Sequence, residues 1–596
     1  MGAAAGAFEG AVGGLACMDA ISEFVVLERG GVRWQMRPGL EHLFGPNGLR
    51  LDEWLAAGQT RVVKHGPHRT VYHVVLSGLD FYLKHNRLAD YRAKLRELVR
   101  PSKARIEYEH ARVVAARQVP TFEPLAFGEP CRSLAARDSF LITRALPETR
   151  PLHSFLETTL PQWPLLRQTR LRQRLAVALG RLLARMHDAG IAHHDLHPGN
   201  LLLRLDAEDR PELFLIDLHA VRIGSPLSWH ARRANLILLN RWFSLRSERT
   251  DRLRFWRVYQ SSPSLKRKRR ADQQSLAYAS DPDAIADLES RTLVSNLRMW
   301  RKLDRRCFGG NRHFRRVCAD GVAGHAAADL SDEVLAPLLA NPDAPFERPD
   351  KIVLKRSPSS AVLEFDLPGP NGPRRVIYKR FAVTRWSDPW AALFRPPPAL
   401  RSYVLGHGLL LRCLPTPRPL AVWHRYRHGL AHEGYLLTEK VADALELRSF
   451  VDGLTSLPAA ECRKRLRRLI DQTAHLLATL HQRRLSHRDL KAANLLVGGV
   501  SMLSSDGDVS LSFIDLVGVR RLRKLRRSRR VQNLARLNTS FLGHPVLTRS
   551  DRLRFLRVYL RWGLRGRIGW KRWWKQIAEA TANKIQRNLH KGRPLG

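Results

Sequence analysis

One short pattern occurs twice, about half a chain apart, and no other feature constrains the fold as strongly. "GIAHHDLHPGNLLL" occupies residues 190–203 and "RLSHRDLKAANLLV" occupies residues 484–497, and both read H-x-D-L-x-x-x-N-L-L. Five further segments recur around it in the same order: 80–86 with 375–381, 119–128 with 414–422, 140–146 with 435–441, 214–222 with 512–520 and 251–259 with 551–559. Each copy is long enough to bury its own core, so the sequence describes a duplicated domain rather than a solenoid.

The duplication sets the expected domain boundaries. Proline, aspartate and alanine cluster between periodic segments at residues 330–350, which is typical of a connection between domains. We therefore predict a flexible tail over residues 1–24, a first domain over 25–330, a linker over 331–350 and a second domain over 351–596.

Each copy is expected to contain a small β-rich lobe followed by a helical lobe. In the first copy, apolar alternation over 70–76 and 80–85 predicts two paired strands, and residues 102–119 read as a helix. A longer helix with an apolar face leads into each H-x-D motif, and short strands follow it. The predicted fold class is therefore α+β.

The composition is that of a globular protein, and it argues against several classes of protein. Apolar residues make up 44% of the 596 residues, and no charge-free apolar run approaches the length of a membrane span. The N-terminus has no Lys or Arg before its apolar part, which argues against a secretory signal. The six cysteines are scattered without a C-x-x-C pair, so neither a zinc site nor a disulfide framework is expected.

The charge is unusual. Lys and Arg number 101 and Asp and Glu 55, which gives a net charge of +46 and indicates an anionic partner: nucleic acid, an anionic membrane surface or a phosphorylated glycan. The densest basic runs lie at 266–270, 520–530 and 561–575. The last interleaves four Trp with cations, a pattern that suits either a membrane interface or the edge of a core helix. Any one run can also be a solvated face. No nucleic-acid fold signature is present, which counts against that partner.

The repeated motif carries residues suited to phosphoryl transfer. An Asp and an Asn five residues apart, with a second Asp two strand-turns later, can converge at one place. The first Asp can orient or deprotonate a hydroxyl, while the Asn and the second Asp offer the hard oxygen ligands that Mg²⁺ prefers. A Lys on an upstream strand, held by a helix carboxylate, supplies positive charge for the α- and β-phosphates. Catalysis at such a site is mostly positioning and charge compensation.

On these residues the sequence resembles protein-kinase-like phosphotransferases, and more narrowly the lipopolysaccharide core heptose and Kdo kinase family. The resemblance depends on "LSHRDLKAANLLV", on IDL where kinases begin D-F-G, and on the "PTFEP" and "PTPRP" segments after the first helix. It implies two tandem bilobal kinase-like domains. "HHDLHPGN" alone is also similar to aminoglycoside and choline phosphotransferases.

The resemblance implies the following roles in the first copy: Lys84 as the phosphate lysine, Glu107 as its helix partner with Glu109 as the alternative, Asp195 as the catalytic carboxylate, and Asn200 and Asp217 as magnesium ligands. In the second copy it implies Lys379 for the phosphates, Asp489 as the catalytic carboxylate, Lys491 beside the transferring phosphoryl group, and Asn494 and Asp515 as magnesium ligands.

Three departures from the family pattern matter. The second copy has Ser402 where the first has Glu107, which removes the expected anchor of Lys379. The first copy has His194 where the motif usually has Arg. Neither copy has a G-x-G-x-x-G loop; the first has only Gly66 in "KHGPHRT", where basic residues would cover the phosphates.

We expect an ATP- and Mg²⁺-dependent kinase that acts on a sugar hydroxyl of lipopolysaccharide or another lipid-linked glycan. The resemblance implies a cytoplasmic protein, peripheral on the anionic face of the inner membrane. One alternative is a tandem kinase and pseudokinase, in which one half has a regulatory or binding role. Another is a small-molecule or protein kinase. A further alternative is a protein that binds nucleic acid through its basic runs. The acceptor, the working half and the oligomeric state stay open at this point.

Overall fold

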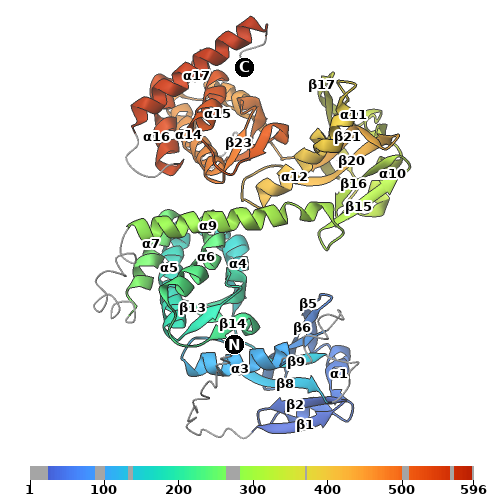
Figure 1. Cartoon of the computed structure of the whole chain (residues 1–596), viewed down its shortest axis with the longest axis vertical. Coiled ribbons are helices and arrows are strands. Elements are labelled where there is room, and N and C mark those ends of the chain that lie inside the picture. The colour runs from blue at the N-terminus through green and yellow to red at the C-terminus, as the bar shows by residue number, and fades with distance from the viewer. Residues whose placement is uncertain are drawn as a thin grey trace, which may run out of the picture. The chain divides into compact units, whose positions relative to one another are not determined.

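The structure of the chain, a computed structural model, describes residues 24–87, 101–131, 138–262, 282–369, 372–499, 509–563 and 569–592 (Figure 1). Contacts between Cα atoms divide the chain into two compact units, Met1–Thr292 and Leu293–Gly596. Each unit has a sheet-rich lobe followed by a helical lobe. The predicted α+β class, with two tandem bilobal domains, is confirmed.

The first unit begins with a seven-stranded antiparallel sheet in the order β1-β2-β8-β9-β7-β6-β5. Its strands are β1 (Val25–Arg29), β2 (Val32–Met36), β5 (Thr60–Lys64), β6 (Arg69–Leu76), β7 (Leu79–Asn86), β8 (Pro124–Pro130) and β9 (Ser139–Arg144). Strand β7 alternates, because Leu79, Phe81 and Leu83 are buried in one apolar cluster. Lys84 therefore points to the opposite face, where helix α3 (Lys103–Ala116) contacts the sheet.

The second unit repeats this lobe with the same strand order, β15-β16-β20-β21-β19-β18-β17. Its strands are β15 (Phe314–Ala319), β16 (Val322–Ala327), β17 (Ile352–Ser357), β18 (Ser360–Leu367), β19 (Arg374–Phe381), β20 (Pro419–Arg427) and β21 (Leu430–Glu439). Helix α12 (Pro398–Leu410) takes the place of α3. The register is also conserved between the units, since Val71 pairs with Lys84 and Val362 pairs with Lys379.

The helical lobes also correspond. The first is built from α5 (Leu165–Asp188), β11 (Ile191–His193), β12 (Leu201–Leu205), β13 (Pro211–Leu215), β14 (Val221–Ile223), α6 (Trp229–Arg246), α7 (Arg249–Gln260) and the part of α9 (Pro282–Leu303) up to Thr292. The second is built from α13 (Leu447–Gly453), α14 (Ala459–Gln482), β23 (Leu485–His487), β24 (Leu495–Gly498), β25 (Ser510–Phe513), β26 (Val519–Arg521), α15 (Arg527–Thr539), α16 (Arg549–Gly563) and α17 (Trp570–His590). Leu175, Leu179, Leu182 and Met186 are buried on one face of α5, as their helical spacing predicts.

The boundary between the units lies earlier in the chain than the predicted linker over 331–350. The division falls within α9, and residues 314–327 form the β15–β16 hairpin that pairs with β20 of the second sheet. Within the predicted linker, helix α10 (Asp332–Ala340) packs Leu335, Leu338 and Leu339 into the core of the second unit. A Pro- and Asp-rich composition is thus compatible with an ordered helix when its leucines have a core to cover. Of the predicted tail, residues 1–23 lie outside the described residues.

The Trp-rich run at 561–575 belongs to the core. Trp573 is only 3% exposed, and the Arg527 guanidinium stacks over its ring. Trp570 and Trp574 are partly buried against the same apolar cluster. Of the two readings of this run, the edge of a core helix is therefore correct for these three side chains. Residues 564–568 of this run and the run at 266–270 lie outside the described residues.

A buried ion pair fixes the start of the second unit, and we predict a large stability cost when it is broken. Asp304 and Arg412 form a bidentate pair at 2.8 and 2.9 Å, with side chains 4% and 3% exposed. Asp304→Ala leaves an unpaired buried guanidinium, so the free energy of unfolding should fall by about 3–5 kcal/mol. The matched control is Asp329→Ala, because one nitrogen of Arg418 donates to both oxygens of Asp329 at the surface, where Asp329 is exposed, and such pairs contribute about 0–1 kcal/mol. Urea unfolding of both variants measures the difference, and equal losses would contradict the assignment.

Candidate active site

In the first unit, Lys84 lies in contact with two carboxylates. Its Nζ atom is 2.6 Å from Oε1 of Glu107 on α3 and 3.4 Å from Oδ1 of Asp217. Glu107 is 4% exposed, so Lys84 supplies a charged hydrogen-bond donor to a buried carboxyl group. The alternative, Glu109, instead pairs with Arg105 at the surface. The structure thus brings Lys84, Glu107 and Asp217 together.

Asp217 is held in a special backbone conformation. It has φ 59° and ψ 49°, the left-handed region, directly before the short 3₁₀ helix η5 (Leu218–Ala220). Burial alone would raise the pKa of Asp217, but the charges of Lys84 and Arg69 outweigh it and hold the pKa below its ordinary value. The carboxylate is therefore ionised at neutral pH and is still 21% exposed. It remains accessible to a cation.

Asp195 and Asn200 lie beside Asp217 and are ordered by backbone contacts. The Asn200 amide donates to the Asp195 carbonyl oxygen at 2.8 Å, and the Ile216 N–H donates to the Asn200 carbonyl oxygen at 3.1 Å. His193 joins the two loops, since its Nδ1 accepts from the Asp195 N–H and its Nε2 lies 3.1 Å from the Ile216 carbonyl oxygen. The Asp195 side chain is 73% exposed, so it is open to an incoming substrate.

Several residues near this cluster were not assigned by the sequence. Arg69, from the "KHGPHRT" segment, donates to both oxygens of Asp217 at 3.1 and 3.4 Å. His219 lies with Nδ1 3.8 Å from Oε2 of Glu107, and burial lowers its pKa. His110 on α3 contacts the Leu218 carbonyl oxygen at 2.8 Å. These contacts join α3 to the Asp217 loop, and no repeated spacing marks them in the sequence.

The second unit brings together Lys379 and Asp515, at 3.0 Å, and Asn494 and Asp489, through the 2.7 Å contact from the Asn494 amide to the Asp489 carbonyl oxygen. Asp515 has φ 51°, like Asp217. Burial would raise the pKa of Asp515, but Lys379 lowers it below the ordinary value. Lys491 lies just before the short helix η10 (Ala492–Asn494), half-buried.

The second unit lacks three of the side chains that surround Lys84 in the first. Ser402 replaces Glu107 and donates to its own helix, to the Pro398 carbonyl oxygen. Val517 stands at the position of His219 and packs with the apolar cluster of α12. Ser360 stands at the position of Arg69, as the strand register shows. Lys379 therefore pairs with Asp515 but has no carboxylate on the neighbouring helix that would correspond to Glu107 beside Lys84.

The donor set of the first unit fits Mg²⁺. Because the Asn200 nitrogen is bound to the Asp195 carbonyl oxygen, the amide oxygen is the atom that remains for a cation. Together with the ionised Asp217 carboxylate it makes two hard oxygen ligands, the kind that Mg²⁺ takes from a protein while phosphate and water complete its shell. Asn494 and Asp515 offer the same pair in the second unit.

Comparison with known proteins gives one family. The profile of the lipopolysaccharide kinase (Kdo/WaaP) family matches residues 54–259 and 394–559, one segment in each unit and together more than half of the chain.

The chain belongs to this family.

Two curated members are lipopolysaccharide core heptose(I) kinases named WaaP. The one from Pseudomonas aeruginosa is 32% identical over 168 residues, which cover 27% of this chain and 60% of that protein. The one from Escherichia coli is 30% identical over 151 residues, covering 24% and 55%. The matched region thus spans less than two thirds of the length of either relative.

Among solved structures, WaaP in complex with acyl carrier protein is similar over 44% of this chain and 98% of that one, at 24% identity and a TM-score of 0.31. A rhoptry antigen kinase domain of Toxoplasma gondii is similar over 27% and 49%, at 16% identity and a TM-score of 0.21.

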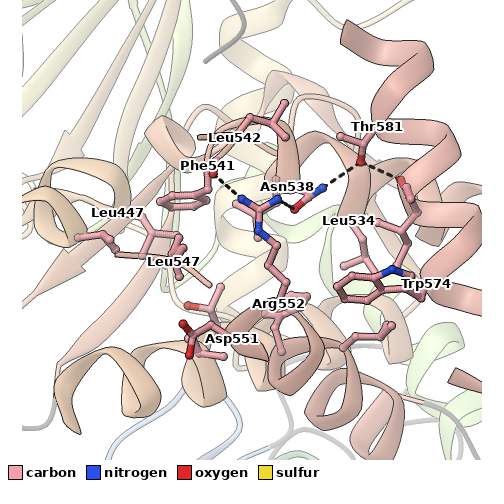
Figure 2. Close-up of a pocket in the computed structure, with 18 of the residues that line it drawn as sticks. Leu447, Leu534, Asn538, Phe541, Leu542, Leu547, Asp551, Arg552, Trp574 and Thr581 are labelled. Atoms are coloured by element: carbon pink, nitrogen blue, oxygen red, sulfur yellow. Dashed lines mark hydrogen bonds between the residues drawn. The ribbon is translucent and has the colours of Figure 1, made fainter. Parts of the chain in front are cut away.

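Each helical lobe of this family member also contains an apolar cavity, and both lie apart from the cluster around Lys84 or Lys379. The cavity of the second unit, about 410 Å³, is enclosed by α14–α17 (Figure 2). Figure 2 shows Arg552 along one wall, where it donates to Asn538, which in turn donates to Thr581. The cavity of the first unit is about 420 Å³, with Arg252 and Asn240 at the matching positions. None of the predicted site residues lines either cavity.

Within the described ranges, no helix has an apolar stretch of the length and hydropathy that a bilayer-spanning segment requires.

A buried histidine in each helical lobe predicts acid sensitivity. His481 lies 2.7 Å from the Tyr559 hydroxyl and 3.0 Å from the Asn533 amide oxygen, and burial lowers its pKa to about 3. The pKa of a histidine in an unfolded chain is about 6.5. Between these two pKa values the unfolded chain binds more protons than the folded chain, so the free energy of unfolding falls as the pH decreases. By pH 5 the loss should be about 2 kcal/mol from this residue. His481→Gln should flatten the pH dependence of urea unfolding between pH 7 and 5, and an unchanged slope would contradict the assignment.

Proposed function

We propose that the chain is an ATP-dependent phosphotransferase that phosphorylates a sugar hydroxyl of lipopolysaccharide or a related lipid-linked glycan. One observation carries the proposal: Lys84 contacts both Glu107 and Asp217 beside the loop of Asp195 and Asn200. Family membership supports phosphoryl transfer, and the names of the two curated relatives support the sugar acceptor.

Each residue has a task that its geometry supports. Lys84, kept in place by Glu107, would bind the α- and β-phosphates of ATP, and Arg69 adds a second positive charge beside Asp217. Asp217 and Asn200 would hold Mg²⁺, which when bound neutralises charge on the phosphates. Asp195, largely exposed, would orient the acceptor hydroxyl and accept its proton.

We assign transfer to the first unit and a regulatory or binding role to the second. The second unit retains Lys379, Asp489, Asn494 and Asp515 but has Ser402, Val517 and Ser360 where the first has Glu107, His219 and Arg69. Since catalysis at this kind of site depends on a fixed positive charge, loss of the carboxylate that fixes it is expected to lower activity more than nucleotide binding. A lipid-linked acceptor would place the protein at the cytoplasmic face of the inner membrane.

The function is tested by incubating the purified full-length chain with γ-labelled ATP, Mg²⁺ and extracted lipopolysaccharide. We expect label in the glycolipid, recovered with a core sugar after mild hydrolysis, and no transfer when EDTA is added. Parallel reactions contain an aminoglycoside or a basic protein as acceptor. Label in either of these but not in the glycolipid would contradict the proposed acceptor, and no transfer to any of the three would contradict the proposed activity.

A further inference from the structure

The segment at 385–395 in the second unit exposes four large apolar side chains. Trp386 is 85% exposed, Trp390 56%, Leu393 60% and Phe394 91%. Three of them belong to the short helix α11 (Asp388–Phe394), and Trp386 lies just before it. Single exposed apolar residues are common on the surfaces of soluble proteins, but four within nine positions form a patch of the kind that marks an interaction site.

The segment is anchored to the unit and is not a loose loop. Helix α11 lies beside β21 (Figure 1), and Pro389 is buried in its first turn. The Asp388 carboxylate accepts from the backbone N–H groups of Thr384 and Arg385 at 3.1 and 3.0 Å, so the one acidic group of the segment is used locally. The apolar side chains are thus presented outward from a fixed base.

Basic residues surround the patch. Arg385 and Arg395 are exposed and border it on either side. Burial lowers the pKa of Arg401 on α12, and the nearby charges of Arg488, Arg395 and Arg520 lower it further. Among the described residues, no carboxylate forms a salt bridge with any of these arginines. A surface with unpaired guanidinium groups beside exposed rings complements negatively charged headgroups.

We propose that the 385–395 segment docks the chain on an anionic phospholipid bilayer. Trp386, Trp390 and Phe394 would enter the boundary between headgroups and acyl chains, where aromatic side chains are favoured, while Arg385 and Arg395 bind lipid phosphates. The charge of the surroundings favours a bilayer over a second copy of this chain, since two copies would bring like charges together. The inference deepens the proposed function, because a lipid-linked acceptor lies in such a surface.

Flotation with vesicles tests the docking without nucleotide, so a failure of docking and a failure of catalysis are measured separately. The probe is vesicles of phosphatidylcholine with about 30 mol% phosphatidylglycerol, which gives the bilayer surface a negative charge. We expect the full chain to bind, and Trp386→Ala/Phe394→Ala to lower partitioning at least about tenfold. Arg385→Gln/Arg395→Gln should weaken binding and reduce its dependence on salt.

The matched control is Leu165→Ala/Leu166→Ala, which removes two side chains of 73% and 76% exposure from the first unit. It should bind vesicles like the unaltered chain. All the altered side chains are exposed, so folding should be unaffected, and a thermal melt checks this. Equal binding by the Trp386→Ala/Phe394→Ala variant, or no binding by the unaltered chain, would overturn the proposal. So would a dimer of the unaltered chain that becomes monomeric in this variant, because the patch would then be an interface between copies.

Discussion

Replacing Asp195 with Asn is expected to lower the rate of phosphate transfer by about 10²–10⁴-fold, the usual contribution of a general base. The change removes the proposed proton acceptor but preserves the size of the side chain. The Asn200 contact is to the Asp195 backbone carbonyl, which the variant keeps. In the part of the chain that the structure describes, neither Lys84 nor Asp217 forms a hydrogen bond or an ion pair with the Asp195 side chain, so ATP affinity should remain within about threefold. Initial rates and nucleotide titration measure the two effects separately.

The matched control is Asp489→Asn, the same change at the same motif position of the second unit. If the first unit performs the transfer, this variant should keep its rate within about threefold of the unaltered chain. A large loss from Asp489→Asn together with a small loss from Asp195→Asn would reverse the assignment of the two units. Unchanged activity in the double variant would reject both carboxylates.

Lys84→Met is the second change with a large expected effect, about 10²–10³-fold in kcat/KM. Two consequences combine: the phosphates lose a fixed positive charge, and Glu107 keeps a buried carboxylate without its 2.6 Å partner. The unpaired carboxylate should also cost about 1–3 kcal/mol of stability. Both kinetic constants and urea unfolding should be measured on the same preparation.

Lys379→Met provides the comparison in the second unit. Lys379 contacts Asp515 at 3.0 Å and has Ser402 instead of a carboxylate on the helix, so its removal leaves no buried acid. We expect little loss of stability and a rate within about threefold of the unaltered chain. If Lys84→Met and Lys379→Met lower the rate equally, the contact of Glu107 with Lys84 does not make the first unit the more active one, and the assignment of transfer to that unit would be contradicted.

Much of this site could be predicted because the constraint is local. The spacing of Asp195 and Asn200 places both on one short loop, and the alternation of β7 puts Lys84 on the face opposite its buried neighbours. Glu107 could be found by counting back from the segment after the helix. In each case a few residues of sequence fix the geometry.

What could not be predicted depends on contacts between distant segments. Arg69 and His219 reach the cluster from two separate elements, and nothing in their spacing marks them. The sequence predicts the β15–β16 hairpin in the first domain because the Pro- and Asp-rich segment that follows it has the composition of a linker, although helix α10 in that segment packs into the core of the second unit. For the Trp run at 561–575, an amphipathic pattern looks the same whether its apolar face covers a core or a membrane.

The central claim is that Asp217 holds the metal of the nucleotide in the first unit. Mn²⁺ binding in the presence of ATP, followed by electron paramagnetic resonance on the full chain, tests it most directly, because Mn²⁺ accepts the same oxygen ligands as Mg²⁺. We predict that Asp217→Asn weakens the tightest ATP-dependent Mn²⁺ site at least about tenfold while Asp515→Asn leaves it unchanged. An Asp217→Asn variant that binds Mn²⁺ with unaltered affinity would contradict the account.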